Sequence, residues 1–301
     1  MTLDIKIVLS AFVLLLLMDI VSGEFKKPRM FTMNELGTSL LSILTLFAVR
    51  AGQFAAVNYL LMWLIPTGQG VLASVNPLLV FAVAILLDDY GNYWVHRLGH
   101  TLKWAWRLHK PHHTPTHLNV LATLRNNWIF YLLIPNTMST ALLYFLGATE
   151  ASMAMLSLKL VILYLQHSGT RWDLWLRRAG AGRVLLNMLE KIFVLQDYHH
   201  VHHGLGRYGN ASANYANLFV FWDHVHGTSM GTPHKRQDAY GLPVGVKVEP
   251  WYEQLWWPFF GLQMKSKQPA PVQLRNYSEA ELASAAAVII TASGQAIAVS
   301  A

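Results

Sequence analysis

The sequence predicts an all-α integral membrane protein, with four to five transmembrane helices in hairpins and a cytoplasmic, helical, histidine-rich cap. Apolar residues make up 53% of the 301 residues and charged residues only 13%, about half the charged fraction of a soluble domain. Apolar runs long enough to span a bilayer recur before residue 166. Thirteen of the fourteen histidines lie between positions 96 and 226. This composition excludes a disordered chain, a coiled coil and an ordinary cytosolic enzyme.

Five apolar stretches are predicted to be membrane spans, because each approaches the roughly 20 residues that a bilayer requires. The first lacks the basic start and the small-residue cleavage site of a signal peptide, so we interpret it as an uncleaved anchor. Arg50 lies near the middle of the second, where it indicates a functional residue, a snorkelling side chain or a break between two shorter helices. The five stretches are residues 3–21, 39–65, 71–87, 128–146 and 151–165.

The basic residues predict how these spans pair. The net charge is +7, from 23 basic and 16 acidic residues, and in a membrane protein this excess indicates positive-inside loops rather than nucleic-acid binding. With Lys26 and Lys27 in the cytoplasm, spans two and three form one hairpin and spans four and five form another. Segment 90–127 and the chain after residue 168 then lie on the cytoplasmic side. We therefore expect a multi-pass protein whose active site faces the cytoplasm.

The predicted spans and the positions of the histidines divide the chain into three regions. Residues 1–70 are expected to form N-terminal membrane anchor helices, residues 71–230 the domain that carries the histidine clusters, and residues 231–301 a cytoplasmic or interfacial tail. The aromatic residues near Trp256 in the tail indicate either contact with the membrane interface or core packing. Ser278 and Glu281 have the spacing of a capping box that opens a short, alanine-rich helix.

The histidines form three clusters and one isolated position. Residues four apart on a helix project from one face, so an H-x-x-x-H pair can bind one ion. In the first H-x-x-H-H cluster, Pro111 disfavours helical geometry at Lys110, and we expect a helix end or turn there. Because the chain has no cysteine, thiolate and Fe–S sites are excluded. The clusters and the isolated position supply nine candidate metal ligands: His96, His100, His109, His112, His113, His167, His199, His202 and His203.

Nine imidazoles exceed the roughly three protein ligands of a single catalytic zinc site. Imidazole suits zinc, copper, iron and nickel, so the ligand count favours a dinuclear centre but leaves two zinc ions open. Three further histidines are candidate additional ligands, although a histidine taken singly is more often a hydrogen-bonded residue near the membrane surface. They are His200, His224 and His226.

The order of these clusters resembles the membrane fatty acid hydroxylase and sterol desaturase superfamily of histidine-box di-iron oxygenases. The resemblance covers about residues 75 to 230 and extends beyond the histidines. Matching segments are Asp89–Arg97, Leu118–Thr123, Gln166–Ser168, Asn214–Asn217 and Phe221–Asp223, the last followed by Gly227 and Thr228. The resemblance implies that residues 71–230 form a fatty acid hydroxylase-like catalytic domain.

The resemblance also implies an activity. The nine histidines are expected to hold two iron ions, with dioxygen as co-substrate, and to hydroxylate an unactivated C–H bond of a membrane lipid, whether a fatty acyl chain, a sterol or a related apolar chain. An external electron donor of the reductase, ferredoxin or cytochrome type is expected. The alternatives are a lipid or sterol desaturase, an ether-lipid monooxygenase of the same superfamily, and a non-catalytic metal-binding membrane protein.

Other polar residues are expected to orient the imidazoles through hydrogen bonds, as partners behind metal ligands commonly do. These candidates are Asp89, Tyr93, Asp197, Asn214 and Asp223. The chain departs from the family where a histidine usually follows the second cluster, because Asn127 stands in its place. If that histidine contacts metal or substrate, we expect either that Asn127 replaces it or that the contact is lost, in which case His224 or His226 is a candidate to compensate.

Overall fold

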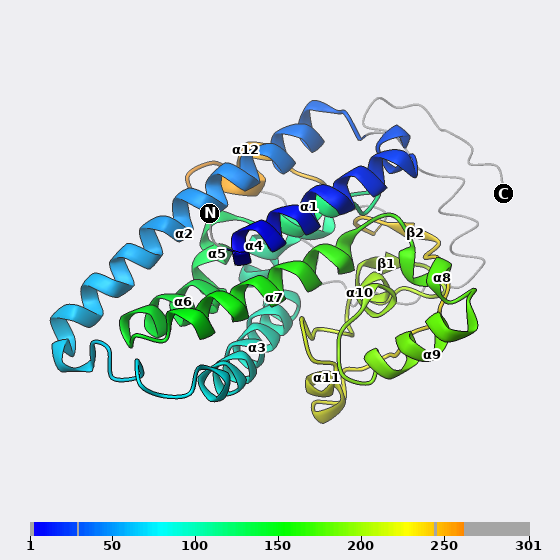
Figure 1. The fold of residues 1–301 in the computed structure, drawn as a ribbon. Coiled ribbons are helices and arrows are strands. Elements are labelled where there is room, and N and C mark those ends of the chain that lie inside the picture. The colour runs from blue at the N-terminus through cyan, green and yellow to red at the C-terminus, as the bar shows by residue number, and fades with distance from the viewer. Residues whose placement is uncertain (1–2, 29, 244–245, 262–301) are drawn as a thin grey trace.

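The structure is a computed structural model that describes residues 3–28, 30–243 and 246–261 (Figure 1). The expected capping box at Ser278 and Glu281 lies outside these residues. The described chain is mostly helical, as predicted. It also contains an antiparallel pair of short strands, β1 (Gly204–Leu205) and β2 (Ala239–Tyr240). This pair lies beside the histidine-bearing helix α10 (Gln196–His203), at the end of the molecule away from the helix hairpins.

Within the described residues, two helices are long and apolar enough to cross a membrane. They are α2 (Met33–Leu64) and α3 (Pro77–Thr101). The α2 helix begins where the Thr32 side chain accepts a hydrogen bond from the Glu35 backbone N–H, and it continues without interruption past Arg50. This continuity excludes a break at Arg50, one of the three alternatives that the sequence left open. Large apolar side chains such as Leu44 and Trp63 are exposed along α2, as a helix in contact with lipid requires.

Helix α3 links the apolar region to the first histidine pair. Asn76 accepts a hydrogen bond from the Leu78 N–H, and Pro77 occupies the first helical position, which suits a residue without an N–H. The helix continues well beyond the expected end of the third span at residue 87, up to Thr101. His96 and His100 therefore lie on its last turns, on a rigid extension of an apolar helix.

The remaining expected spans have a different form. The fourth is divided at Pro135 into α5 (Trp128–Leu133) and α6 (Asn136–Phe145), because proline cannot supply the N–H that a continuous helix would need. The first and fifth correspond to α1 (Leu3–Val21) and α7 (Thr149–His167), which pack against each other. A span count above two stays a prediction, and so does the orientation.

Short helices form the cap. Helix α4 (Lys103–His113) continues through Pro111, so the predicted loss of helical geometry at Lys110 was wrong, while the predicted helix end falls at His113. A proline in the last turn removes only one terminal hydrogen bond. The other short elements are α8 (Trp172–Leu176), α9 (Gly180–Leu189), α11 (Phe221–Val225), α12 (Trp251–Trp256) and the 3₁₀ helices η1 (Glu24–Lys26), η2 (Pro66–Gly68) and η3 (Val120–Leu124).

The described part of the tail returns to the long helices. Helix α12 packs against α2, and a Cβ atom added to Gly37 would lie 2.8 Å from the Trp251 ring. The Asn34 side chain donates to the Glu249 carbonyl at 3.2 Å, and Glu249 forms an ion pair with Lys110 of α4. The tail thus joins the apolar helix α2 to the helix that carries the second histidine cluster.

Candidate metal centre

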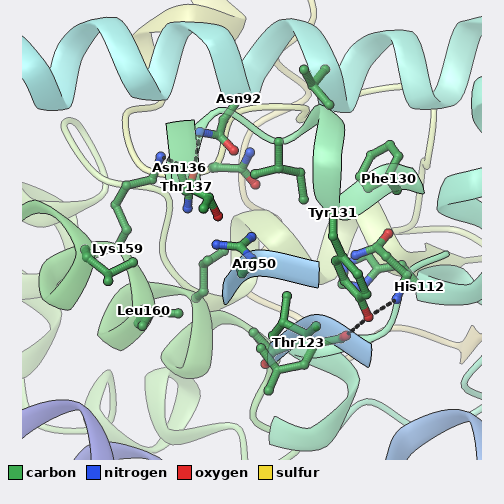
Figure 2. Close-up of a pocket in the computed structure, with 18 of the residues that line it drawn as sticks. Arg50, Asn92, His112, Thr123, Phe130, Tyr131, Asn136, Thr137, Lys159 and Leu160 are labelled. Carbon is green, nitrogen blue, oxygen red and sulfur yellow. Dashed lines mark hydrogen bonds between the residues drawn. The ribbon is translucent and has the colours of Figure 1, made fainter. Parts of the chain in front are cut away.

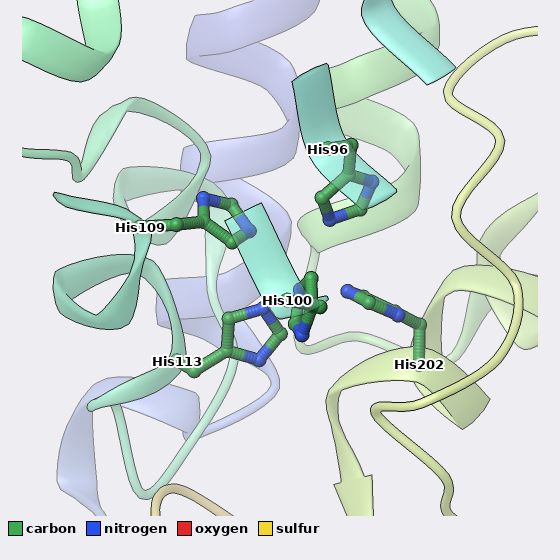
Figure 3. A group of neighbouring side chains, drawn as sticks. All are labelled: His96, His100, His109, His113 and His202. Carbon is green, nitrogen blue, oxygen red and sulfur yellow. The ribbon is translucent and has the colours of Figure 1, made fainter. Parts of the chain in front are cut away.

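The structure gathers the nine candidate ligands into two adjacent groups. Within each group, the imidazole nitrogens that face one another all lie within 4.8 Å. The first group draws on α3, α4 and α10, and Figure 3 shows its five rings directed toward a common point. The second group draws on α4, α7 and α10. The first contains His96, His100, His109, His113 and His202, and the second contains His112, His167, His199 and His203.

Each of the two H-x-x-H-H clusters supplies ligands to both groups, but the group that receives two ligands from one cluster receives one from the other. From α4, His109 and His113 enter the first group, whereas His112 enters the second. From α10, His199 and His203 enter the second group, whereas His202 enters the first. The i and i+4 positions thus share a group, and the i+3 position, rotated to the other side of that turn, joins its neighbour.

The two groups meet face to face. The rings of His113 and His203, one from each group, stack with their centroids 4.3 Å apart and their planes at 20°. Close approach of α3 and α4 depends on Gly99, where an added Cβ would lie 3.3 Å from the His109 Cβ. The sequence spacing therefore folds into one continuous centre with two halves.

Hydrogen bonds determine which nitrogen each ring presents. His96 donates its Nδ1–H to the Tyr215 carbonyl at 2.7 Å, and His202 donates to the Ala213 carbonyl at 2.8 Å. A carbonyl can only accept, so each neutral ring keeps a lone pair on Nε2. The Nε2 atoms of all five rings in the first group are buried without a hydrogen-bond partner in the described chain. Five convergent ring nitrogens without partners form a candidate cation site, and the Nδ1 contacts of His96, His109 and His202 leave a lone pair on three of them.

In the second group, carbonyls again accept from Nδ1–H groups, and the Nε2 atoms lie close to one another. His112 donates Nδ1–H to the Ala122 carbonyl and His167 donates to the Leu163 carbonyl, yet their Nε2 atoms lie 3.1 Å apart. The Nε2 atom of His199 lies 3.0 Å from those of His167 and His203. The lone pairs of His112 and His167 face each other without a proton between them, an arrangement that a metal ion would stabilise.

These distances fit a metal. Two nitrogens about 2.1 Å from one ion and at right angles around it lie about 3 Å apart. Burial lowers the pKa of the α4 and α10 imidazoles well below the usual value, which keeps them in the neutral form that binds metal. The lowered pKa values are those of His109, His112, His113, His199, His202 and His203.

Within the described residues, the three aspartates expected to orient the imidazoles bind other groups around the centre and not the ligand rings themselves. Asp223 accepts from the backbone N–H groups of Tyr215 and Ala216 at 2.9 and 2.8 Å, and from the hydroxyls of Tyr198 and Thr228. It therefore fixes the peptide whose carbonyl receives His96. The physical reason is that backbone carbonyls already accept from the imidazole N–H groups. The carboxylate instead binds the backbone segment that presents such a carbonyl.

Asn214 lies between the two carbonyls that receive His96 and His202. Its backbone adopts the left-handed region, with φ of 56°, which asparagine tolerates better than most residues. Its side chain donates to the Tyr198 and Gly231 carbonyls and accepts from the Met230 N–H at 2.7 Å. Asn214 thus orients both carbonyls without touching an imidazole.

Asp89 and Tyr93 also support the centre from a distance. Asp89 accepts from the backbone N–H groups of Leu218 and Phe219 and from the Trp222 indole at 3.0–3.1 Å. The Tyr93 hydroxyl lies 3.0 Å from the Thr228 hydroxyl. Both residues tie α3 to the 214–228 segment, and neither contacts a ligand imidazole in the described residues.

Asp197 ties the start of α10 to the start of α8, a few residues after α7. It forms an ion pair with Arg171, which also binds Asp173, and it accepts from the His234 N–H. Burial raises the pKa of Asp197, and the Arg171 guanidinium opposes this shift. The arrangement holds the helices that carry His167 and His199 together.

The three candidate additional ligands lie outside both groups. His200 is buried, with Nδ1 2.7 Å from the Tyr240 hydroxyl, and His224 is exposed. His226 stacks on Tyr93 at a centroid distance of 4.9 Å and an interplanar angle of 14°.

Asn126, which the sequence reasoning missed, is the side chain that receives a ligand imidazole. Its Oδ1 atom accepts from His109 Nδ1 at 2.9 Å. The neighbouring Asn127 instead accepts from the Ile129 N–H to begin α5, and donates to the carbonyls of Gln254 and Trp257. Asn127 therefore does not replace a family histidine at the centre.

Asn126 provides a test of this contact. Replacing it with alanine is expected to weaken metal binding by roughly 10- to 100-fold, the usual effect of losing a partner behind a metal ligand. Asn126→Asp keeps an acceptor for His109 and should retain most of the affinity. Titration of metal-free protein with ferrous iron measures both. Equal affinities for the alanine and aspartate variants would contradict this role.

Asp19 was missed because it lies in a segment expected to serve only as an anchor. It is fully buried and accepts from the Val120 N–H at 2.9 Å, the Ser168 hydroxyl at 2.6 Å and the Thr170 N–H at 3.0 Å. It thus connects α1 both to the η3 segment that receives His112 and to the loop after His167. An aspartate near the end of an apolar run was the available signal.

A cavity of about 430 Å³ adjoins both groups (Figure 2). Its wall includes His96 and His109 of the first group, and it reaches α2 at Phe47, which is 67% exposed. Ligand pockets of a few hundred Å³ with apolar walls commonly bind small molecules. Three ligands of the second group also line it: His112, His167 and His199.

The fold and the centre together define a class: a helical membrane-type protein with nine inward-facing histidines in a two-part site. The comparison with family models gives the family. The model described as "Fatty acid hydroxylase" matches residues 81–228, inside the expected 71–230 region, whose bounds stay a prediction. Residues 81–228 thus form a region of the fatty acid hydroxylase family, and all nine histidines of the two groups lie within it. The resemblance inferred from the histidine clusters is confirmed.

Curated relatives agree with this membership. Alkylglycerol monooxygenase from Danio rerio is 30% identical over 191 residues, covering 59% of this chain and 36% of that protein. The human alkylglycerol monooxygenase is 30% identical over 170 residues, covering 53% and 32%. Methylsterol monooxygenase 1-1 from Arabidopsis thaliana is 25% identical over 224 residues, covering 70% and 69%. The chain thus spans about a third of the alkylglycerol monooxygenases, and no solved structure matches it.

Proposed function

We propose that the protein is an oxygen-dependent di-iron oxygenase that hydroxylates a membrane lipid at an unactivated C–H bond. The observation that carries the proposal is the cavity, because its wall includes histidines from both groups. A lipid chain inside it would lie against the centre. The family membership supports the oxidative chemistry, and the methylsterol and alkylglycerol relatives support a lipid substrate.

The nine histidines are proposed to hold two iron ions, five nitrogens in one group and four in the other. Bound iron supplies the activation of dioxygen, with one oxygen atom inserted into a C–H bond and the other leaving as water. The chain holds the imidazoles in their Nε2-presenting form and encloses the site. Tyr215, Ala213 and Ala122 contribute to this through the carbonyls that receive Nδ1–H groups.

The reaction consumes two electrons and two protons besides dioxygen, so we propose an external electron donor of the reductase, ferredoxin or cytochrome type. The positive-inside pattern supports a centre on the cytoplasmic side, where such donors are available. Substrate would enter from the bilayer, because the cavity reaches α2 beside the exposed Phe47. Residues 71–230 are proposed as the catalytic domain, although Asp19 shows that the N-terminal helix also supports the centre.

A second candidate is an ether-lipid monooxygenase, favoured by the alkylglycerol monooxygenases among the relatives. This reaction would use the same centre, with oxygen inserted beside an ether oxygen. The desaturase alternative would leave a new double bond and no inserted oxygen. The three reactions therefore differ in their products.

Isotopic dioxygen separates these reactions. Membranes that contain the protein are supplied with ¹⁸O₂ and an electron donor, and total lipids are compared by mass spectrometry with membranes that contain the His113→Ala variant. We expect a lipid that gains one ¹⁸O atom only with the unaltered protein. Cleavage of ether lipids would favour the second candidate, and new double bonds without label would indicate a desaturase. Label confined to a water-soluble product would refute the proposal.

A further inference from the structure

The wall of the cavity has an unbalanced charge. Its charged side chains are Arg50 of α2 and Lys159 of α7, and no aspartate or glutamate of the described chain lines it. The histidines that line it contribute no charge in their neutral, metal-binding form. The cavity therefore has two cations on its wall before any iron binds.

Lys159 already has its counter-charge. Its ammonium forms an ion pair with Asp88 of α3, behind the cavity wall, and donates to Asn136 at 3.2 Å. Asn92 completes this network by donating to Asp88 at 3.1 Å and to Asn136 at 2.6 Å. The network neutralises one of the two cations and fixes the polar end of the cavity.

Arg50 has no such partner. Its Nε atom is buried without a hydrogen bond, and its guanidinium makes no ion pair or hydrogen bond within the described residues. Figure 2 shows it in the cavity near Tyr131 and Thr137. The Asp88 carboxylate also acts on Arg50, but it is already paired with Lys159 and makes no ion pair with Arg50. A guanidinium without an anion of its own in an apolar helix bundle is costly, so its presence indicates a ligand that supplies a further negative charge.

We propose that Arg50 binds the anionic head group, a carboxylate or a phosphate, of an amphiphilic substrate whose chain extends to the histidines. This inference rests on the proposed function and specifies its substrate class. The planar guanidinium suits both oxyanions because it can donate two parallel hydrogen bonds. The Thr137 hydroxyl lines the same part of the cavity and can add a donor. Apolar residues such as Leu160 and Leu163 line the remainder and suit the chain.

The test compares three probes that share a sixteen-carbon skeleton: palmitate, hexadecyl phosphate and hexadecanol. Equilibrium binding is measured on the purified full-length protein in detergent by isothermal titration calorimetry. We expect at least one of the two anions to bind roughly 10- to 100-fold more tightly than hexadecanol, the difference that charge-assisted hydrogen bonds provide. The tighter of the two anions identifies the head group. Equal affinities for all three probes would overturn the proposal without any variant.

Variants locate the effect. Arg50→Met, which keeps an apolar side chain of similar length, should remove the preference for the anion and leave hexadecanol affinity unchanged. Arg50→Lys should keep part of the preference. Arg178→Met is the matched control, because Arg178 is exposed and lies outside the cavity. An anion preference that persists in Arg50→Met would overturn the assignment, and unchanged hexadecanol binding shows that the cavity is intact.

The test of anion binding and the test of oxygen insertion can succeed or fail independently. Binding preference is measured without turnover, whereas oxygen insertion is read from ¹⁸O in extracted lipids. If a neutral lipid is labelled and the protein shows no preference for anions, the oxygenase proposal is supported and the role of Arg50 is excluded. An anion preference without label in any lipid would keep the binding site and remove the oxygenase.

Discussion

Replacing His113 with alanine is expected to lower lipid oxidation by at least about 100-fold. The loss should exceed the 10- to 100-fold effect of removing a partner behind a metal ligand, because a candidate ligand itself is lost. His113 presents a buried, unpaired Nε2 to the first group and stacks on His203 of the second. Its removal would therefore affect both halves of the centre.

The measurement is product formation in membranes, normalised to the amount of inserted protein. His224→Ala is the matched control, since His224 is exposed and lies in neither group, and it should keep full activity. Membrane insertion of both variants should equal that of the unaltered chain. Substantial activity in His113→Ala would remove this residue from the ligand set and weaken the assignment of the first group.

Replacing Asp223 with alanine is expected to have the second largest effect, through stability and metal affinity together. Two backbone N–H groups and two hydroxyls would lose their acceptor inside the protein. Each buried donor left unpaired costs about 1–3 kcal/mol, so the free energy of unfolding should fall by about 3 kcal/mol or more. The Tyr215 carbonyl would also lose its fixed position, which should weaken metal binding.

Asp238→Ala is the control for this prediction. Asp238 is an exposed carboxylate paired with Arg207, and surface ion pairs contribute only about 0–1 kcal/mol. Denaturant unfolding of both variants in detergent, together with their iron content, measures the two effects. An Asp223→Ala variant as stable and as iron-rich as the control would show that the 214–228 segment does not depend on this carboxylate.

The histidine geometry was predictable because it follows from helical periodicity. Spacings of four residues place His96 with His100, and His199 with His203, wherever the segment is helical. The division of each H-x-x-H-H cluster between two groups could not be predicted in the same way. It depends on how α4 and α10 face each other, which local spacing does not specify.

The partners of the imidazoles were predicted less well, for a physical reason. Four of the hydrogen-bonded ligands donate to backbone carbonyls, those of Tyr215, Ala213, Ala122 and Leu163. Every residue has a carbonyl, so the sequence carries no signal for this role. The aspartates have a recognisable pattern, but they bind the segments that present the carbonyls.

Hydropathy alone does not predict where the helices are continuous, where they divide or which of their polar residues support the centre. For Arg50 the sequence left a functional residue, a snorkelling side chain and a helix break open, and α2 excludes the break by continuing through it. An arginine beside a cavity does not interrupt backbone hydrogen bonds. Pro135 divides the fourth stretch into α5 and α6. Asp19 lies in the segment expected to be an anchor, and only the fold shows that it joins α1 to the centre.

The central claim is that the two histidine groups hold two iron ions. The most direct measurement is anomalous X-ray scattering at the iron absorption edge from crystals of protein produced in iron-replete cells. We predict two iron positions per chain, one among the Nε2 atoms of His96, His109 and His202, and one among those of His112, His167 and His199. A single iron position, or iron bound outside both groups, would contradict it.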